Sequence, residues 1–175
     1  FEENLRNFYA TISKSNSYQT LKDNFDYLEK LRLEQLKNEN RKDYQSKHLI
    51  EFEVGISEEK AKEYLSLGID INEGFKQYID DLKTKFGMNT LQMSIHRDEG
   101  YIDKDNILHH NIHAHFIVYN YNFETKKAIL SNFRKKDYRQ LQTLAQKSFN
   151  QVGLDFKRGL SKFQTKLKHQ KRNDF

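Results

Sequence analysis

The feature that most constrains the fold is the run from Asn111 to Tyr119, in which two histidines stand two residues apart among apolar residues. Side chains at positions i and i+2 of a strand point to the same face, so a strand here places His113 and His115 side by side. The opposite face, available to a hydrophobic core, carries Ala114, Phe116 and Val118. Neutral imidazoles arranged in this way are ready ligands for a divalent metal ion. A lone His-x-His is more often a pair of ordinary strand histidines, so the neighbouring sequence has to decide.

Residues 89–96 alternate in the same manner and end on a third histidine, His96, which falls on the polar face of that predicted strand. Glu99 follows three residues later. If the two strands are neighbours, His96, His113 and His115 converge on one ion, with Glu99 within reach. Three imidazoles and a carboxylate suit Mn, Mg, Zn or Fe, and they leave coordination positions open for a substrate.

The size and composition of the chain favour a single domain with a substantial core, because it has 175 residues, 36% of them hydrophobic. No apolar run reaches the roughly 20 residues of a membrane span. The chain has no cysteine, which fits a reducing compartment and an expected cytoplasmic location. Within residues 1–175 we expect an N-terminal helical region over 1–47 and a basic tail over 157–175. The basic, open-ended tail suggests the N-terminal part of a longer protein.

The distribution of charge points toward polyanions. The net charge is +5, and the sequence pI is about 9.2. Between positions 157 and 172 the chain has basic residues and no acidic one: Lys157, Arg158, Lys162, Lys166, Lys168, Lys171 and Arg172. Such a segment is either a solvated tail or an arm that contacts phosphates, and the sequence leaves both open.

The spacing of apolar residues predicts the order of the elements. Period-3.6 patterns predict helices over 18–37, 57–67, 71–86 and 135–152, and alternation adds a strand over 48–54. Residues 98–108 are expected to form a loop, 154–156 a short strand, and 5–13 either a strand or a helix. The predicted fold class is α+β, an antiparallel sheet with helices packed on one face. The polar face with the histidines would stay open for a substrate.

The motif residues resemble a known family. His96-Arg97-Asp98-Glu99 followed by His113-Ala114-His115 is similar to the signature of the MobV (Mob/Pre) plasmid mobilization relaxases, members of the HUH endonuclease group. The resemblance covers roughly residues 48–160, including the segment after the last helix, 153–159. It implies an HUH relaxase-like two-layer sandwich that nicks one DNA strand at a plasmid transfer origin. The implied cofactor is Mn or Mg, the implied intermediate is a covalent 5'-phosphate, and the implied partners are single-stranded DNA and other mobilization proteins.

The resemblance also implies roles for individual residues. The metal-ligand positions of the family match His96, Glu99, His113 and His115. Residues expected to hold single-stranded DNA are basic: Arg97, Lys157, Arg158, Lys162, Lys166 and Lys168.

The sequence departs from the family pattern in two places. Thirteen residues without proline, Gly100–Ile112, separate the acidic pair from His-x-His, and His109 or His110 in this insertion is a candidate to replace a ligand. The family's N-terminal nucleophile motif is not present as such. We therefore take Tyr27 as the first candidate nucleophile and Tyr18 as the second.

Three other interpretations compete with this one. An HUH rolling-circle replication initiator would use Tyr138, on the helix after His-x-His. A non-catalytic DNA-binding module of a mobilization system would use its histidines only structurally, as we expect for His48. A cupin-type metal enzyme is set aside, because Val118 and Tyr119 stand where cupins carry a glutamate and the chain has only seven glycines.

Overall fold

The computed structural model describes residues 18–45 and 47–159. The predictions for residues 5–13 and for Lys162, Lys166 and Lys168 lie outside this part of the chain.

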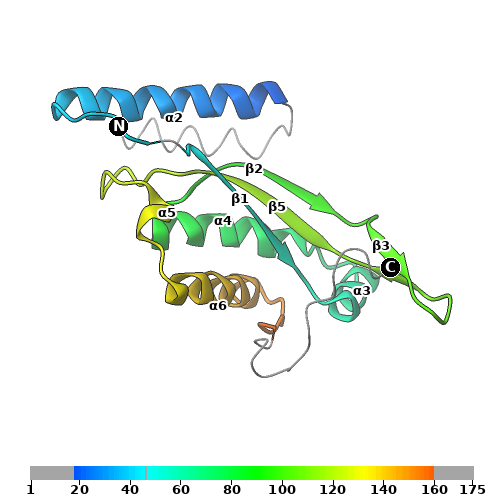
Figure 1. Cartoon of the computed structure of the whole chain (residues 1–175). Helices are drawn as coiled ribbons and strands as arrows, with labels where there is room; N and C mark the ends of the chain where they lie inside the picture. The colour runs from blue at the N-terminus through cyan, green and yellow to red at the C-terminus, as the bar shows by residue number, and fades with distance from the viewer. Residues whose placement is uncertain (1–17, 46, 160–175) are drawn as a thin grey trace.

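The described residues form a mixed α+β fold, as predicted (Figure 1). The elements in chain order are α2 (Tyr18–Asn38), β1 (Leu49–Gly55), α3 (Glu58–Ser66), α4 (Asn72–Phe86), β2 (Asn89–His96), β3 (Gly100–Ile102), β4 (Leu108–His110), β5 (His113–Tyr119), α5 (Ile129–Asn132) and α6 (Lys135–Gln151).

Local sequence signals set several of these boundaries. The Ser57 side chain caps α3 by accepting a hydrogen bond from the backbone N–H of Lys60, which satisfies a free helix donor. Gly87 ends α4 in the left-handed conformation, with φ of +68°, a conformation that glycine adopts at little cost. Both signals lie at the ends of helices that the apolar spacing had predicted.

The main sheet has the strand order β1-β5-β2, with β5 in the centre and antiparallel to both neighbours. The register pairs His96 with His113 across β2 and β5, and Glu53 with His115 across β1 and β5. The two strands that carry the three histidines are therefore direct neighbours, which was the condition for their convergence.

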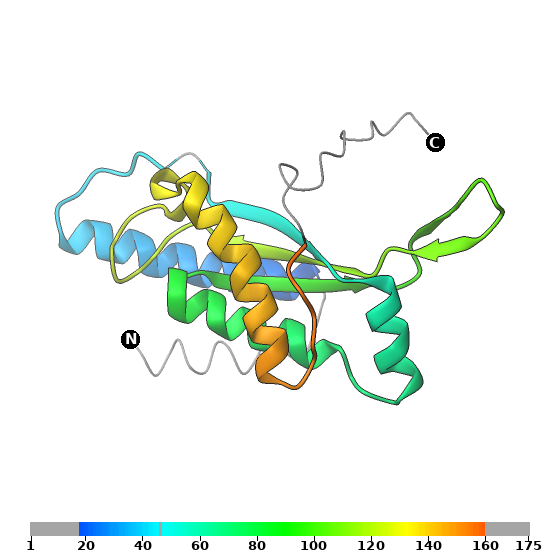
Figure 2. The same ribbon diagram turned by 90° about the horizontal axis from the view of Figure 1, so that it is seen from below.

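The apolar face of the sheet packs on α4 and α6 and forms the larger core (Figure 2). Phe116, at the middle of β5, is fully buried. Its ring stacks on Phe52 of β1 at 5.2 Å between centroids and meets Tyr78 of α4 edge-on at 5.6 Å. Burial of such side chains is the main favourable term in folding, so the period-2 pattern of β5 serves packing on this side.

Helix α2 packs on the other face of the sheet, which differs from the predicted two layers with helices on one face only (Figure 1). The physical reason is that the histidine face of β5 becomes apolar toward its end, at Ile117 and Tyr119. Leu28 of α2 joins a second buried cluster with Tyr119 and Leu91. Within residues 18–45 and 47–159, one half of the histidine face is therefore covered by α2, and the half with the histidines is not.

A buried ion-pair network fixes α2 in this position. Arg32 is 1% exposed and binds Glu29 at 2.6 Å and Asp43 at 2.7 Å. Glu29 in turn accepts hydrogen bonds from the Tyr119 hydroxyl and from His48. Hydrogen bonds from Arg32 lower the pKa of Asp43 to about 2. His48 thus has the structural role that we expected.

Residues 100–110 form a β-hairpin, where the sequence analysis predicted a loop. Strands β3 and β4 pair antiparallel and project beyond the end of the main sheet (Figures 1 and 2). Residues 154–156 form no strand in the structure, although Leu154 and Phe156 are buried in the larger core. The short helix α5 was not predicted.

Candidate metal centre

The three predicted histidines lie together on the uncovered half of the sheet. Their ring centroids are 5.0 Å apart for His96 and His113, 5.2 Å for His96 and His115, and 5.0 Å for His113 and His115. His113 is buried, while about a third of each of the other two side chains is exposed. The cluster therefore opens to solvent through His96 and His115.

Polar contacts orient all three imidazoles, through hydrogen bonds for His113 and His115 and through the Glu99 carboxylate for His96. Nδ1 of His113 lies 2.8 Å from the carbonyl oxygen of Asn111, and because a carbonyl only accepts, this nitrogen carries the proton. Nδ1 of His115 donates to Glu51 at 3.1 Å, and Nδ1 of His96 lies 2.8 Å from a carboxylate oxygen of Glu99. A neutral imidazole held in this way keeps its Nε2 lone pair for an ion.

Glu99 lies between two of the histidines. One carboxylate oxygen lies 2.8 Å from Nδ1 of His96, and the other lies 3.6 Å from Nε2 of His113. With Nδ1 of His113 protonated, the facing atoms are a lone pair and a carboxylate oxygen, which repel unless a proton or cation compensates them. Together with the donor set, this arrangement fits a divalent ion. His96, Glu99 and His113 offer ligand atoms within 4.8 Å of one another.

The base of the hairpin keeps Glu99 at this place although thirteen residues separate it from His113. The backbone N–H of Asn111 donates to the carbonyl of Glu99 at 2.8 Å. The chain therefore returns to its starting point before β5 begins, and Glu99 stays next to His113.

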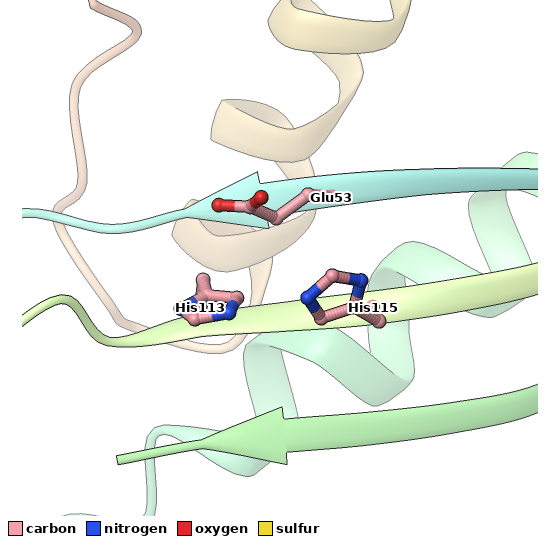
Figure 3. Close-up of side chains that lie close together, drawn as sticks. All are labelled: Glu53, His113 and His115. Carbon is pink, nitrogen blue, oxygen red and sulfur yellow. The ribbon is translucent and has the colours of Figure 1, made fainter. Parts of the chain in front are cut away.

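Glu53 is a second carboxylate at the cluster, and the sequence analysis did not select it. Glu53, His113 and His115 also have ligand atoms within 4.8 Å of one another. Figure 3 shows the three side chains on the same face of β1 and β5, with the Glu53 carboxylate turned toward His113. The alternation of residues 48–54 placed Glu51 and Glu53 on one face, but only the strand order shows that this face is the histidine face.

His109 and His110 belong to neither of these two groups. His109 lies between Asp103, at 3.0 Å, and Glu58, at 3.3 Å. The hydrogen bond to Asp103, followed by that to Glu58, raises the pKa of His109. These contacts tie the hairpin to the start of α3, so both nitrogens of His109 have structural partners.

A pocket of about 620 Å³ lies beside Glu99, between the hairpin and the start of α3. Its lining residues are Glu58, Asp98, Glu99, Gly100, Tyr101, His109, His110 and Asn111.

The candidate tyrosines lie in three different settings. Tyr27 packs against the smaller core cluster, and its hydroxyl is buried. Tyr18, the first residue of α2, is 78% exposed. Tyr138 is 53% exposed and meets the Phe133 ring at 5.5 Å, but its helix α6 packs on the sheet face opposite to the histidines.

The basic candidates within the described residues have mixed contacts. Arg97 is exposed and donates to the Asn72 side chain at 2.7 Å. Arg158 donates to Thr143 at 3.0 Å, whereas Lys157 is exposed. The structure therefore brings together the four predicted metal ligands, whereas the described basic candidates belong to neither metal-ligand group.

Comparisons of the chain with protein-family models, with curated proteins and with solved structures found no match. In the described part of the chain, no helix is both long enough and apolar enough to cross a membrane.

Proposed function

We propose that the protein is a metal-dependent endonuclease that nicks single-stranded DNA at a plasmid transfer origin, as a relaxase does in conjugative mobilization. The observation that carries the proposal is the triangle of three imidazoles, supplemented by Glu99, on a part of the sheet that residues 18–45 and 47–159 leave uncovered. Such a site leaves room for a phosphodiester. The net positive charge of the chain favours an anionic substrate.

A bound Mn or Mg ion would supply charge stabilisation at the scissile phosphate as it becomes pentacovalent. The residues of the chain would do the rest. His96, Glu99, His113 and His115 would hold the ion, while Glu51 and the Asn111 carbonyl keep two of the imidazoles in the required orientation.

In the chemical step a tyrosine oxygen attacks phosphorus and loses its proton. The bond between phosphorus and the 3'-oxygen breaks, and that oxygen leaves as a hydroxyl after taking up a proton. The 5'-phosphate stays on the tyrosine and can later be rejoined by the reverse reaction. No further reactant is consumed.

The structure favours Tyr18 over Tyr27 as the attacking residue. Glu29 of α2 contacts Tyr119 of β5, and Tyr18 precedes Glu29 by 11 residues, or about 16 Å of helix. A distance of about 16 Å back along β5 from Tyr119 corresponds to about five residues of strand. It ends between His113 and His115, so the start of α2 lies at the same height along the sheet as the histidines. Tyr18 is exposed at this end of α2 (Figure 1), whereas the Tyr27 hydroxyl is buried away from substrate.

The test is a nicking assay on a labelled single-stranded transfer-origin oligonucleotide with MnCl₂, followed by denaturing electrophoresis to detect the covalent adduct. We expect the wild type and Tyr27→Phe to form the adduct and His113→Ala and Tyr18→Phe to form none. An adduct with Tyr18→Phe that is lost in Tyr27→Phe would reverse the order of the two tyrosines. DNA binding that is unchanged by EDTA, with no adduct in any variant, would favour the non-catalytic DNA-binding module.

A further inference from the structure

We infer that Glu53 of β1 is a fifth protein ligand of the same ion, so that a single ion is held by three histidines and two carboxylates. This inference rests on the metal centre of the proposed function, but not on the nuclease reaction.

The position of Glu53 supports a direct role. Its register partner is His115, and its carboxylate belongs with His113 and His115 to a group whose ligand atoms lie within 4.8 Å of one another. Two ligands of one ion at about 2.1 Å each are separated by at most about 4.2 Å. The group therefore needs only small side-chain rotations to surround an ion (Figure 3).

Glu51, two residues earlier on the same face, has a different role. It accepts the Nδ1 proton of His115, which orients the imidazole and leaves its Nε2 free for the ion. No ion pair of Glu53 is found within residues 18–45 and 47–159. The two glutamates thus have different roles. Glu51 orients the ligand His115, and Glu53 would bind the ion directly.

The shared histidine decides that the two groups serve one ion. His113 is a member of both groups, but its Nδ1 is bonded to the Asn111 carbonyl. Only Nε2 remains, and one lone pair binds one ion. The group with Glu99 and the group with Glu53 therefore belong to a single centre. Glu99 reaches it from the end of β2, and Glu53 reaches it from β1.

This ligand count has a consequence for the choice of metal. Five protein ligands leave one position open in an octahedral ion such as Mn²⁺ or Mg²⁺, whereas a four-coordinate zinc site would be overfilled. The charges of the two carboxylates also balance those of the ion. The open position would be the one that a phosphate oxygen occupies.

The experiment is isothermal titration calorimetry of the full 175-residue chain with MnCl₂, in the absence of DNA. The variants are Glu53→Gln, His113→Ala and the matched control Glu59→Gln, which removes one charge from an exposed glutamate of α3. We expect Glu53→Gln to lower Mn²⁺ affinity by about 10- to 100-fold, and Glu59→Gln to equal the wild type. Circular dichroism checks that each variant is folded, and the visible spectrum of the Co²⁺ complex reports the number of ligands.

The outcomes separate this inference from the proposed function. Equal affinities of Glu53→Gln and Glu59→Gln, with a loss only in His113→Ala, would overturn the role of Glu53. An intense, tetrahedral-type Co²⁺ spectrum of the wild type would overturn it as well. Loss of affinity in Glu53→Gln without nicking by the wild type would support the five-ligand centre and refute the nuclease.

Discussion

Gly100→Ala should weaken metal binding although Gly100 touches no ion. Gly100 starts β3, directly after Glu99, and pairs with His110 across the hairpin. A Cβ atom at this position would lie 2.1 Å from the carbonyl oxygen of His109, a distance that has to open by about 0.9 Å to reach 3.0 Å. The neighbouring atom is backbone, so no side-chain rotation relieves the clash, and the base of the hairpin has to move.

The movement is transmitted to Glu99 through the chain. A displacement of about 1 Å is enough to lower the performance of a preorganised site by up to about 100-fold, and loss of a supporting interaction at a metal centre costs about 10- to 100-fold in affinity. We therefore expect Gly100→Ala to reduce Mn²⁺ affinity at least about tenfold by calorimetry. The overpacking itself should destabilise the fold by only about 1 to 3 kcal/mol.

The matched control is Gly159→Ala, because a Cβ at Gly159 meets nothing within 4 Å. It should bind Mn²⁺ as the wild type does. If Gly100→Ala also keeps wild-type affinity while remaining folded, the hairpin base does not position Glu99, and the reasoning fails.

Two further predictions concern the network that fixes α2. Arg32→Met leaves two carboxylates without their buried cation and should cost about 3 kcal/mol, the lower end for a broken buried pair because both partners are partly exposed. The midpoint temperature of thermal unfolding should fall by about 6 to 12 °C. The exposed control Lys30→Met should change the free energy of unfolding by no more than about 0.5 kcal/mol. The pKa of Asp43 is about 2, below its ordinary 3.8, so its contribution is present above pH 3.8 and lost as the pH falls toward 2. Denaturant unfolding between pH 5 and 2 should show this loss in the wild type and a weaker one in Arg32→Met; equal profiles would contradict the pairing.

Most of the regular elements could be predicted from the sequence because their signals are local. The alternation of residues 92–96 and 113–119 places the histidines on the polar face of each strand, although a register shift between Thr90 and Gln92 turns Leu91 toward α2. The caps at Ser57 and Gly87 mark helix ends for similar reasons. The convergence of the histidines followed from these patterns once β2 and β5 proved to be neighbours.

The features that the sequence analysis missed depend on tertiary neighbours. The place of Glu53 beside His113 and His115 follows from the pairing of β1 with β5, which no local pattern reveals. The hairpin was predicted as a loop because its strands have only three residues each, too few for a periodic signal. The position of α2 depends on the point where the histidine face becomes apolar, at Ile117 and Tyr119. Two apolar residues at the end of a strand do not by themselves indicate that a helix packs on that face.

The same strand serves the core and the candidate site, and this determines how rigid the site is. Phe116 is fully buried against α4 and β1, and His115 next to it in the chain points to the opposite face. Any shift of β5 that displaced the imidazoles would also have to unpack Phe116, so core packing holds the ligands in place. Three histidines and Glu53 stand on strands of this kind. Glu99 alone comes from a connection, and the hairpin base at Asn111 compensates for that. The candidate ligands are therefore held in place by the fold itself, and we expect metal binding to require side-chain rotation but no refolding of the sheet.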